Sequence, residues 1–246
     1  MVRSRFRTTY NLILVILLSW GILLTFSNFP TVALPIYEQR QNHSPDGIGK
    51  FYMGREIAHV MGYTGAGWLE RPSREAEEKT SQIVAMLDLK PDDVVADIGA
   101  GTGYLSFLIA PLLTEGKVLA VDIQPQMLEI IDYFKEEKKI NNVEPILATE
   151  TNPNLPANSI DLAIFVDAYH ELAYPQEVMT EIVKSLKPGG KVVLIEYRGE
   201  NPFIMIKPLH KMTQKQAKKE MQAVGLVFQE TKNKLPQQHF MVFTKV

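Results

Sequence analysis

The stretch from Val94 to Tyr104 constrains the fold more than any other part of the chain. It reads Val-Val-Ala-Asp-Ile-Gly-Ala-Gly-Thr-Gly-Tyr, an apolar strand followed by three glycines at alternate positions. Glycine tolerates the positive φ of a tight turn and lets the backbone approach a ligand closely. A strand, a glycine turn and a helix in this order are typical of an α/β fold that binds a nucleotide-like ligand at the carboxyl ends of its strands.

The spacing of the glycines separates two kinds of ligand. A dinucleotide fingerprint that starts at Gly99 needs a glycine or alanine at position 104, where this chain has Tyr104. The pattern that remains, DxGxGxG, resembles that of the S-adenosylmethionine (SAM)-dependent methyltransferases of the seven-stranded class, which include the quinone-biosynthesis type. Asp122 ends the next apolar run, where the resemblance implies a carboxylate that binds the ribose. The alternative is a glycine turn that packs a structural helix, with a solvated Asp122.

Further strands are expected where apolar runs alternate with helical patterns. The predicted strands after the glycine turn cover residues 117–121, 144–148, 160–166, 191–197, 226–231 and 239–245. With the first strand they predict an α/β fold with a doubly wound, mostly parallel seven-stranded sheet. The resemblance implies that the last strand is antiparallel and inserted between the fifth and the sixth. We assign residues 91–246 to this SAM-binding core.

The resemblance implies SAM as the cofactor and assigns its contacts to the ends of the strands. The predicted cofactor-binding residues are Asp97, Gly99, Ala100, Gly101, Thr102, Gly103, Asp122, Ile123, Thr149, Glu150 and Asp167. The family usually places an acid and a small residue after the third strand, where they meet the adenine amino group. This chain has Thr149 before Glu150, so the adenine contact falls to either of the two.

A polar cluster, Asp167-Ala-Tyr-His-Glu171, follows the fourth predicted strand directly. We predict Asp167, Tyr169 and His170 as catalytic residues. The carboxylates and the imidazole can accept or orient a proton, and Tyr169 can wall the methyl site. A purely hydrogen-bonding or helix-capping role for His170 is the alternative. The lack of cysteine excludes thiolate metal sites, and no metal site is predicted.

Residues from later segments are expected to border the substrate. Glu196, Tyr197 and Arg198 end the fifth predicted strand on the active face, and the loop that follows carries Lys207 and His210. A solvated helix face explains the lysines between residues 213 and 224. A solvated helix face does not explain Lys207 and His210, because they lie in the loop.

A cap is expected before the core, over residues 51–90, preceded by a polar linker at 35–50. Ile57, Ala58 and Met61 fit one face of a helix, and a second helix is predicted from Ser73 to Leu87. By the resemblance, Tyr52, Trp68 and Arg71 are candidates to line the cofactor cavity. Packing of the aromatic rings and an ion pair of the arginine are the alternatives.

The first 34 residues are predicted to lie outside the globular part. Arg3, Arg5 and Arg7 precede an apolar run from Leu12 to Phe26, and small residues come before a cleavage point after Ala33. The pattern predicts a secretory signal, or an anchor that associates with a membrane through residues 12–29. The chain is therefore expected to be exported or membrane-anchored. This localisation conflicts with a supply of SAM inside cells.

The predicted function is methyl transfer from SAM to a small-molecule or lipid-like acceptor. A net charge of -2 gives no reason to expect a nucleic acid partner. The short aromatic cap and the N-terminal apolar run favour an acceptor of this kind, and the sequence does not indicate an oligomeric state. The alternatives are a protein methyltransferase and a non-catalytic SAM-binding module.

Overall fold

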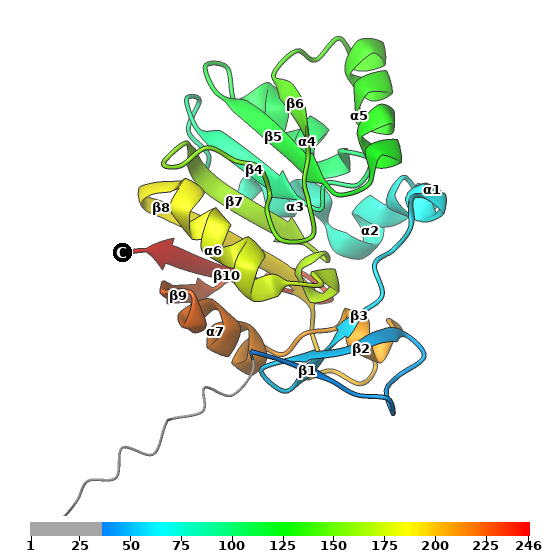
Figure 1. The fold of residues 1–246 in the computed structure, drawn as a ribbon. Coiled ribbons are helices and arrows are strands. Elements are labelled where there is room, and N and C mark those ends of the chain that lie inside the picture. The colour runs from blue at the N-terminus through cyan, green and yellow to red at the C-terminus, as the bar shows by residue number, and fades with distance from the viewer. Residues whose placement is uncertain (1–35) are drawn as a thin grey trace, which may run out of the picture. The chain divides into compact units, whose positions relative to one another are not determined.

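The computed structural model describes residues 36–246, which are built on one seven-stranded sheet (Figure 1). Its strands lie in the order β6-β5-β4-β7-β8-β10-β9, and only β10 runs antiparallel to its neighbours. The strands are β4 (Val94–Ile98), β5 (Lys117–Asp122), β6 (Val143–Leu147), β7 (Ile160–Val166), β8 (Leu186–Tyr197), β9 (Leu226–Thr231) and β10 (Gln238–Lys245). This confirms the predicted sheet, including the antiparallel last strand between the fifth and sixth.

Helices cover both faces of this sheet. Since neighbouring residues of a strand point to opposite faces, Val95 and Ala96 of β4 enter two separate apolar cores. The first core also contains residues of α3 (Thr80–Ala85), α4 (Tyr104–Ile109) and α5 (Pro125–Lys138), and the second contains residues of α6 (Pro175–Ser185) and α7 (Gln214–Ala223). Residues 36–246 also contain four short 3-10 turns: η1 (Tyr63–Gly65), η2 (Ala110–Leu112), η3 (Tyr169–Glu171) and η4 (Pro208–His210).

The segment before the core forms a small antiparallel sheet of β1 (Tyr37–Gln39), β2 (Gly47–Tyr52) and β3 (Arg55–Ala58). The helical face predicted through Ile57, Ala58 and Met61 is therefore wrong. Met53 and Gly54 both have positive φ, 51° and 96°, and make a two-residue turn that joins β2 to β3. Such a turn matches the twist of paired strands, and the hairpin overrides the weak helical pattern. Two of these strands begin within the predicted 35–50 linker.

The helix predicted from Ser73 to Leu87 is interrupted. α2 (Arg74–Glu78) ends at Lys79, whose φ of 60° lies in the left-handed region, and α3 begins at the next residue. A short helix, α1 (Ala66–Leu69), precedes them. The break turns Arg74 and Glu78 toward the large cavity described below, while Ile83 packs in the first core.

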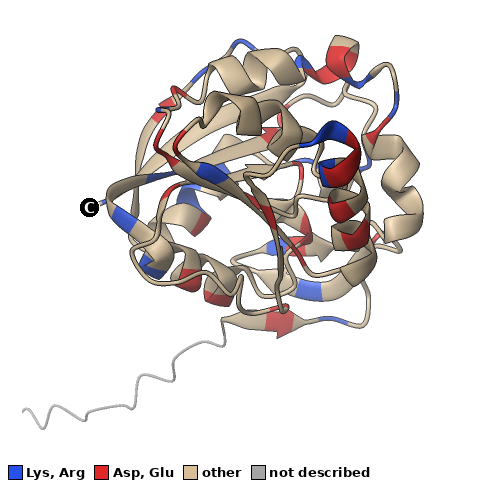
Figure 2. Ribbon diagram, turned by 90° about the horizontal axis from the view of Figure 1, so that it is seen from above, with Lys and Arg blue, Asp and Glu red and all other residues tan. Residues whose placement is uncertain are grey.

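The predicted signal or anchor, residues 1–34, lies outside the described residues. Among residues 36–246, no helix is long and apolar enough to cross a bilayer. Acidic and basic residues are interspersed over the elements seen in Figure 2, in keeping with the small net charge of the chain.

Candidate functional site

The glycine turn after β4 brings bare backbone to the carboxyl edge of the sheet. Gly99, Gly101 and Gly103 have φ values of 71°, 56° and 79°, a region that favours glycine. A Cβ on Gly99 would stand 2.7 Å from the Cβ of Ala168, and one on Gly101 would stand 2.5 Å from Leu69 Cδ1. Larger side chains would therefore collide with the chain that faces the turn.

A cavity of about 700 Å³ opens beside this turn. Ligand sites of small molecules commonly have this size. Seven of the predicted cofactor-binding residues line it: Gly99, Gly101, Asp122, Ile123, Thr149, Glu150 and Asp167. The remaining four, Asp97, Ala100, Thr102 and Gly103, are not part of the lining.

Asp122 is almost fully buried at the end of β5, and it lines the cavity. Its Oδ2 accepts a hydrogen bond from the Gly101 N–H and its Oδ1 from the Gln124 N–H, both at 2.9 Å. Burial raises the pKa of Asp122, and the backbone N–H groups of Gln124, Gly101 and Ile123 oppose that shift. A carboxylate accepts about four hydrogen bonds, so Asp122 keeps a lone pair for the hydroxyl of a ligand.

Asp97 and Thr102, the two buried polar residues of the turn, stabilise it through hydrogen bonds outside the cavity lining. Asp97 Oδ2 accepts a hydrogen bond from Ser106 Oγ at 2.7 Å, which ties the end of β4 to α4. Burial raises the pKa of Asp97 to about 6. Thr102 Oγ1 donates to Glu70 Oε1 at 2.5 Å and connects the turn to the cap.

Thr149 and Glu150 follow β6 at the rim of the cavity, and both are exposed. Thr149 Oγ1 accepts a hydrogen bond from the Asn152 N–H at 3.0 Å, so this hydroxyl holds its own turn. Glu150 is the next residue of the same turn. The adenine contact stays a prediction for these two residues.

Asp167 lies directly after β7 with a φ of 51° and lines the cavity. Its Oδ1 accepts from the Tyr197 N–H at 3.2 Å and its Oδ2 from Gln238 Nε2 at 3.0 Å. Desolvation, together with the negative charge of Glu196, raises the pKa of Asp167 well above its usual range. Both oxygens are held by the protein, so Asp167 fixes the loop between β7 and η3.

The structure does not support Tyr169 as a wall of the methyl site. Its ring is fully buried against Phe165, and its hydroxyl donates to Glu220 Oε2 at 2.8 Å. Glu220 also pairs with Arg55 of β3, through two contacts of 2.9 and 3.1 Å. Tyr169 therefore belongs to a buried network that ties the small sheet to α7, and sequence reasoning missed this network because its members are far apart in the chain.

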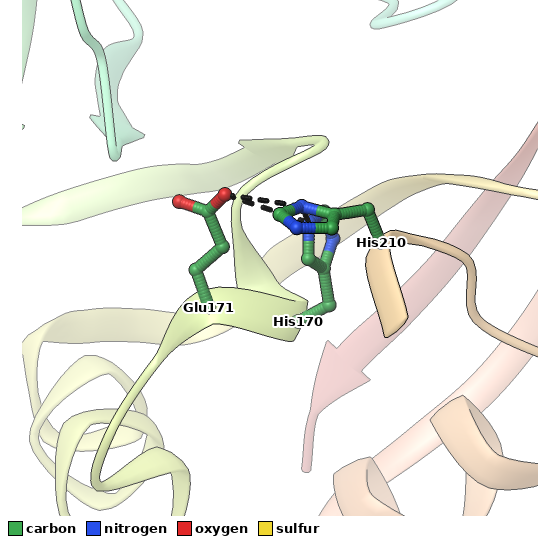
Figure 3. A group of neighbouring side chains, drawn as sticks. All are labelled: His170, Glu171 and His210. Carbon is green, nitrogen blue, oxygen red and sulfur yellow. Dashed lines mark hydrogen bonds and ion pairs between the residues drawn. The ribbon is translucent and has the colours of Figure 1, made fainter. Parts of the chain in front are cut away.

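His170 faces the cavity from η3 with 2% of its surface exposed. Its Nδ1 lies 2.6 Å from Glu196 Oε2, and its Nε2 lies 3.0 Å from His210 Nδ1. Figure 3 shows His170, Glu171 and His210 directed toward one another from η3 and η4. The structure thus brings together His170, Glu196 and His210, which the sequence placed near the substrate separately.

Asp46 is the member of this region that sequence reasoning missed. It lies in the predicted linker and lines the cavity, where its Oδ2 stands 3.2 Å from His210 Nε2. Only the hairpin fold of residues 37–58 places Asp46 here, and nothing in the local sequence marks it.

Arg198, which was expected to border the substrate, donates instead to the carbonyl oxygens of Leu235 and Pro236.

The structure separates the three cap candidates. Tyr52 is buried and donates from its hydroxyl to Gln176 Oε1 at 2.6 Å, which is a packing role. Trp68 is half exposed and lines the cavity. Arg71 stacks on Trp68 at 3.8 Å and pairs with Glu77 and Glu78, so it supports the tryptophan ring from outside the lining.

The residues present fit the predicted cofactor. The acidic residues of the lining outnumber the basic ones, Arg74 and Lys207; they are Asp46, Glu78, Asp122, Glu150, Asp167 and Glu171. Burial raises the pKa of Asp167, but even without its charge the excess of acidic over basic side chains suits a sulfonium cation. Asp122 has a lone pair for a ribose hydroxyl, and Ile123 and Met127 offer apolar surface beside it.

Comparison with known proteins gives the following. The family described as "Methyltransferase domain" matches residues 89–241. A protein-L-isoaspartate O-methyltransferase of Aeropyrum pernix is 27% identical over 143 residues, 54% of this chain and 52% of that protein. The ubiquinone/menaquinone biosynthesis C-methyltransferase UbiE of Hydrogenovibrio crunogenus is 27% identical over 116 residues, 46% of each. The chain spans about half the length of these curated relatives.

A solved structure shares the fold over a larger part of the chain. The crystal structure of a SAM dependent methyltransferase from Aquifex aeolicus superposes with a TM-score of 0.72 at 20% sequence identity. The match covers 76% of this chain and 100% of that one. The similarity therefore extends over the seven-stranded sheet and its helices.

Proposed function

The chain belongs to the methyltransferase-domain family, and we propose that it transfers a methyl group from SAM to a small-molecule or lipid-like acceptor. One observation carries this proposal: a single cavity joins the glycine turn and Asp122 to the polar groups around His170. Transfer between two bound molecules needs both to be held in one space with their reacting atoms close together. Orientation of this kind lowers a barrier by roughly 7 to 11 kcal/mol in favourable intramolecular reactions.

The cofactor end of the cavity is formed by the carboxyl ends of β4, β5 and β6. In our proposal Asp122 accepts hydrogen bonds from the ribose hydroxyls, and Thr149 or Glu150 meets the adenine. Because Gly99 and Gly101 have no side chains, their backbone leaves room for the methionyl part of SAM. When bound, SAM supplies an electrophilic methyl group on a positively charged sulfur, and the carboxylates of the lining favour that charge.

The acceptor end is formed by η3, η4 and the loop that contains Met205. Glu196 holds Nδ1 of His170, which leaves Nε2 of the ring directed at the polar cluster beside the cavity. We propose that this group of side chains binds and activates the acceptor, while Asp167 positions the loop that carries His170. Activation is needed where the attacking atom of the acceptor must lose a proton.

Apolar residues around the mouth of the cavity support a lipid-like acceptor. Val60, Trp68 and Met205 line the cavity and stay 47%, 51% and 94% exposed, and Phe203 in the same loop as Met205 is 87% exposed. Exposed apolar side chains gathered at one opening commonly mark a binding surface. The apolar run at residues 12–29 supports the same proposal, because it would bring the chain to a membrane that contains such acceptors.

Methyl transfer to a protein is the second candidate. The similarity to the protein-L-isoaspartate O-methyltransferase of Aeropyrum pernix favours it, whereas the similarity to UbiE favours a small molecule. A chain that binds SAM and modifies neither kind of acceptor would be a non-catalytic module.

Calorimetry on the full chain with SAM tests cofactor binding. Loss of the charged hydrogen bonds in Asp122→Ala should weaken binding about tenfold or more. The control is Asp132→Ala, an acid on the exposed side of α5 that pairs with Lys135. Unchanged affinity in Asp122→Ala would refute the ribose assignment.

A transfer assay tests the acceptor class. Full-length chain is incubated with SAM carrying a tritiated methyl group and a cell lysate, and the products are separated into lipid, small-molecule and protein fractions. We expect the label in the lipid or small-molecule fraction. Label in protein alone would replace our proposal by the second candidate, and no transfer would leave a binding module.

Cell fractionation tests the proposed localisation. We expect the chain in the exported fraction with an N-terminus at Leu34, or in the membrane fraction with residues 1–33 intact. Recovery of the intact chain in the soluble cytoplasmic fraction would contradict both.

A further inference from the structure

Three potential metal ligands converge at the acceptor end of the cavity. His170 and Glu171 come from η3 and His210 from η4, and Figure 3 shows their side chains meeting at one point. Each offers one ligand atom, and these atoms lie within 4.8 Å of one another. The segments are separated by about 40 residues of sequence, so only the fold brings them together.

The ligand atoms have the separations that a small metal ion requires. Nε2 of His170 and Nδ1 of His210 are 3.0 Å apart, and Glu171 Oε1 lies 3.3 Å from the latter and 3.8 Å from the former. An ion about 2.1 Å from each ligand separates neighbouring ligand atoms by roughly 3.0 to 3.4 Å. Two of the three separations lie in this range, and the third, at 3.8 Å, is longer, while the Met61 N–H holds the other oxygen of Glu171 at 3.1 Å.

Carboxylates hold the opposite nitrogens of both histidines. Glu196 Oε2 lies 2.6 Å from Nδ1 of His170, and Glu196 is itself fully buried and accepts the Tyr169 N–H at 2.9 Å. With the proton on Nδ1, Nε2 presents its lone pair to the cluster. Pairing of the non-ligating nitrogen with a carboxylate is the arrangement that orients histidines in metal sites.

His210 repeats this arrangement with Asp46. Its Nε2 lies 3.2 Å from Asp46 Oδ2, and neither atom has a hydrogen-bond partner within residues 36–246. If this Nε2 carries the proton, it can donate a hydrogen bond to Asp46, and Nδ1 is then free to act as a metal ligand. In that tautomer Nδ1 of His210 carries a lone pair directed at Nε2 of His170 and at Glu171 Oε1.

We propose that His170, His210 and Glu171 bind a divalent first-row transition-metal ion at the acceptor end of the cavity. Two imidazoles and one carboxylate form the donor set that suits Zn²⁺, Fe²⁺ or Mn²⁺, whereas Mg²⁺ and Ca²⁺ prefer oxygen ligands. All three residues line the cavity, so the remaining coordination positions of the ion face the space for the acceptor. An acceptor with a hydroxyl or carbonyl oxygen would fit those positions.

Metal binding by the untagged full chain tests the proposal directly. The chain is treated with a chelator, dialysed and titrated with Zn²⁺ in a calorimeter, and its metal content is measured by mass spectrometry. We expect about one Zn²⁺ per chain and much weaker binding of Mg²⁺. Glu171→Gln and His210→Ala should each abolish the tight site, and Glu196→Gln should weaken it by about 10- to 100-fold.

The control is His59→Ala, a histidine of the same cavity that lies outside the cluster. It should bind Zn²⁺ like the wild type. Equal loss in His59→Ala and His210→Ala, or wild-type binding in both, would overturn the assignment. The absence of Zn²⁺ binding would favour a metal-free cluster in which a protonated His210 bridges Glu171 and Asp46.

The metal site goes beyond the proposed methyl transfer, and the two fail separately. SAM affinity is measured on His210→Ala in the absence of metal, where this variant should match the wild type. A chain that binds Zn²⁺ without SAM would refute the proposed function alone. A chain that binds SAM without Zn²⁺ would refute the metal site alone.

Discussion

The two ends of the cavity are built in different ways. The cofactor end is made from the glycine turn after β4, the carboxylate that ends β5 and the turn after β6, all at the carboxyl edge of the sheet. The acceptor end is made from single side chains of distant segments: Asp46, His170, Glu196 and His210. A site that depends on backbone geometry leaves a motif in the sequence, whereas a site assembled from isolated side chains becomes visible only in the fold.

The two ends also differ in their electrostatics. At the cofactor end, backbone N–H groups satisfy Asp122, and Ser106 satisfies Asp97. At the acceptor end, two histidines meet several carboxylates at low exposure, and among the described residues Asp46 Oδ2 and His210 Nε2, which lie 3.2 Å apart, make no hydrogen bond. Buried polar groups cost free energy unless they are paired, so the acceptor end is the part less well explained by stability alone.

The largest effect is expected from His170→Ala. If the acceptor end activates the acceptor, turnover should fall by about 100- to 10,000-fold, the usual contribution of a positioned acid or base, while SAM affinity stays nearly unchanged. Steady-state kinetics and calorimetry on the same preparation separate the two quantities. His59→Ala, in the same cavity, is the matched control and should keep wild-type turnover.

The reverse outcome would break the distinction between the two ends. A His170→Ala variant with wild-type turnover and weakened SAM binding would assign the ring to the cofactor. Its urea unfolding curve should be recorded as well, because the ring is buried beside Glu196 and a folding defect would lower both quantities.

Asp97→Asn tests whether the cofactor end contains a purely structural carboxyl. The pKa of Asp97 is raised from 3.8 to about 6 by burial, so the folded state binds its proton more tightly than the unfolded state does. The stability that this proton provides is fully present below about pH 4 and is lost as the pH rises through about 6. The free energy of unfolding of the wild type, relative to Asp97→Asn, should therefore fall by about 3 kcal/mol over this range.

Urea unfolding between pH 4 and 7 measures this difference. Ser106→Ala is the informative companion, because the Ser106 hydroxyl lowers the pKa of Asp97 and its removal should move the midpoint to higher pH. A difference between wild type and Asp97→Asn that does not change with pH would show that the carboxyl is not desolvated in solution.

Gly99→Ala probes the backbone origin of the cofactor end. Gly99 and Gly189 have φ values of 71° and 74°, but only at Gly99 would a Cβ meet another atom, Ala168 Cβ at 2.7 Å. Both alanine variants carry the cost of a left-handed residue, about 1 to 2 kcal/mol. Overpacking at Gly99 should add about 1 to 3 kcal/mol to its loss of unfolding free energy.

SAM affinity should fall in Gly99→Ala alone. The extra methyl group separates the glycine turn from Ala168, and the turn lines the cavity, whereas Gly189 is not part of the lining. Equal effects of the two substitutions on stability and on affinity would mean that the turn has room to relax.

The sequence predicted the strands of the sheet and the strand that the glycine turn follows, because these features depend on local patterns, as in the apolar runs of β5 and β7. The position of the antiparallel last strand came from the family resemblance. The hairpin of β2 and β3 was missed because Met53 and Gly54 were not recognised as a turn, and short apolar runs fit a helix as well as a strand. The break at Lys79 was missed because a left-handed lysine leaves no signal in the residue pattern.

The sequence predicted that the residues of the candidate site lie at the carboxyl edge of the sheet. It did not predict which of their side chains contact the cavity or one another. His170 and Tyr169 are neighbours in the sequence, yet one faces the cavity and the other is buried against Phe165. Which of two adjacent side chains turns inward depends on Glu220 and Glu196, which come from later segments. Asp46 had no signal at all, since its position depends on the small sheet.

The smallest effect is expected at the adenine contact, where the sequence left Thr149 and Glu150 as equal candidates. The hydroxyl of Thr149 accepts the Asn152 N–H, and its own N–H donates to the Asn152 carbonyl, so this residue is already used by the turn. Glu150 is exposed at the rim and is the better partner for an amino group. Glu150→Gln should weaken SAM binding by about 3- to 10-fold, the loss of one modest hydrogen bond, and Thr149→Val, which removes the hydroxyl, should weaken it less. Calorimetry on both variants decides between them, and an affinity loss in Thr149→Val alone would move the adenine contact back by one residue.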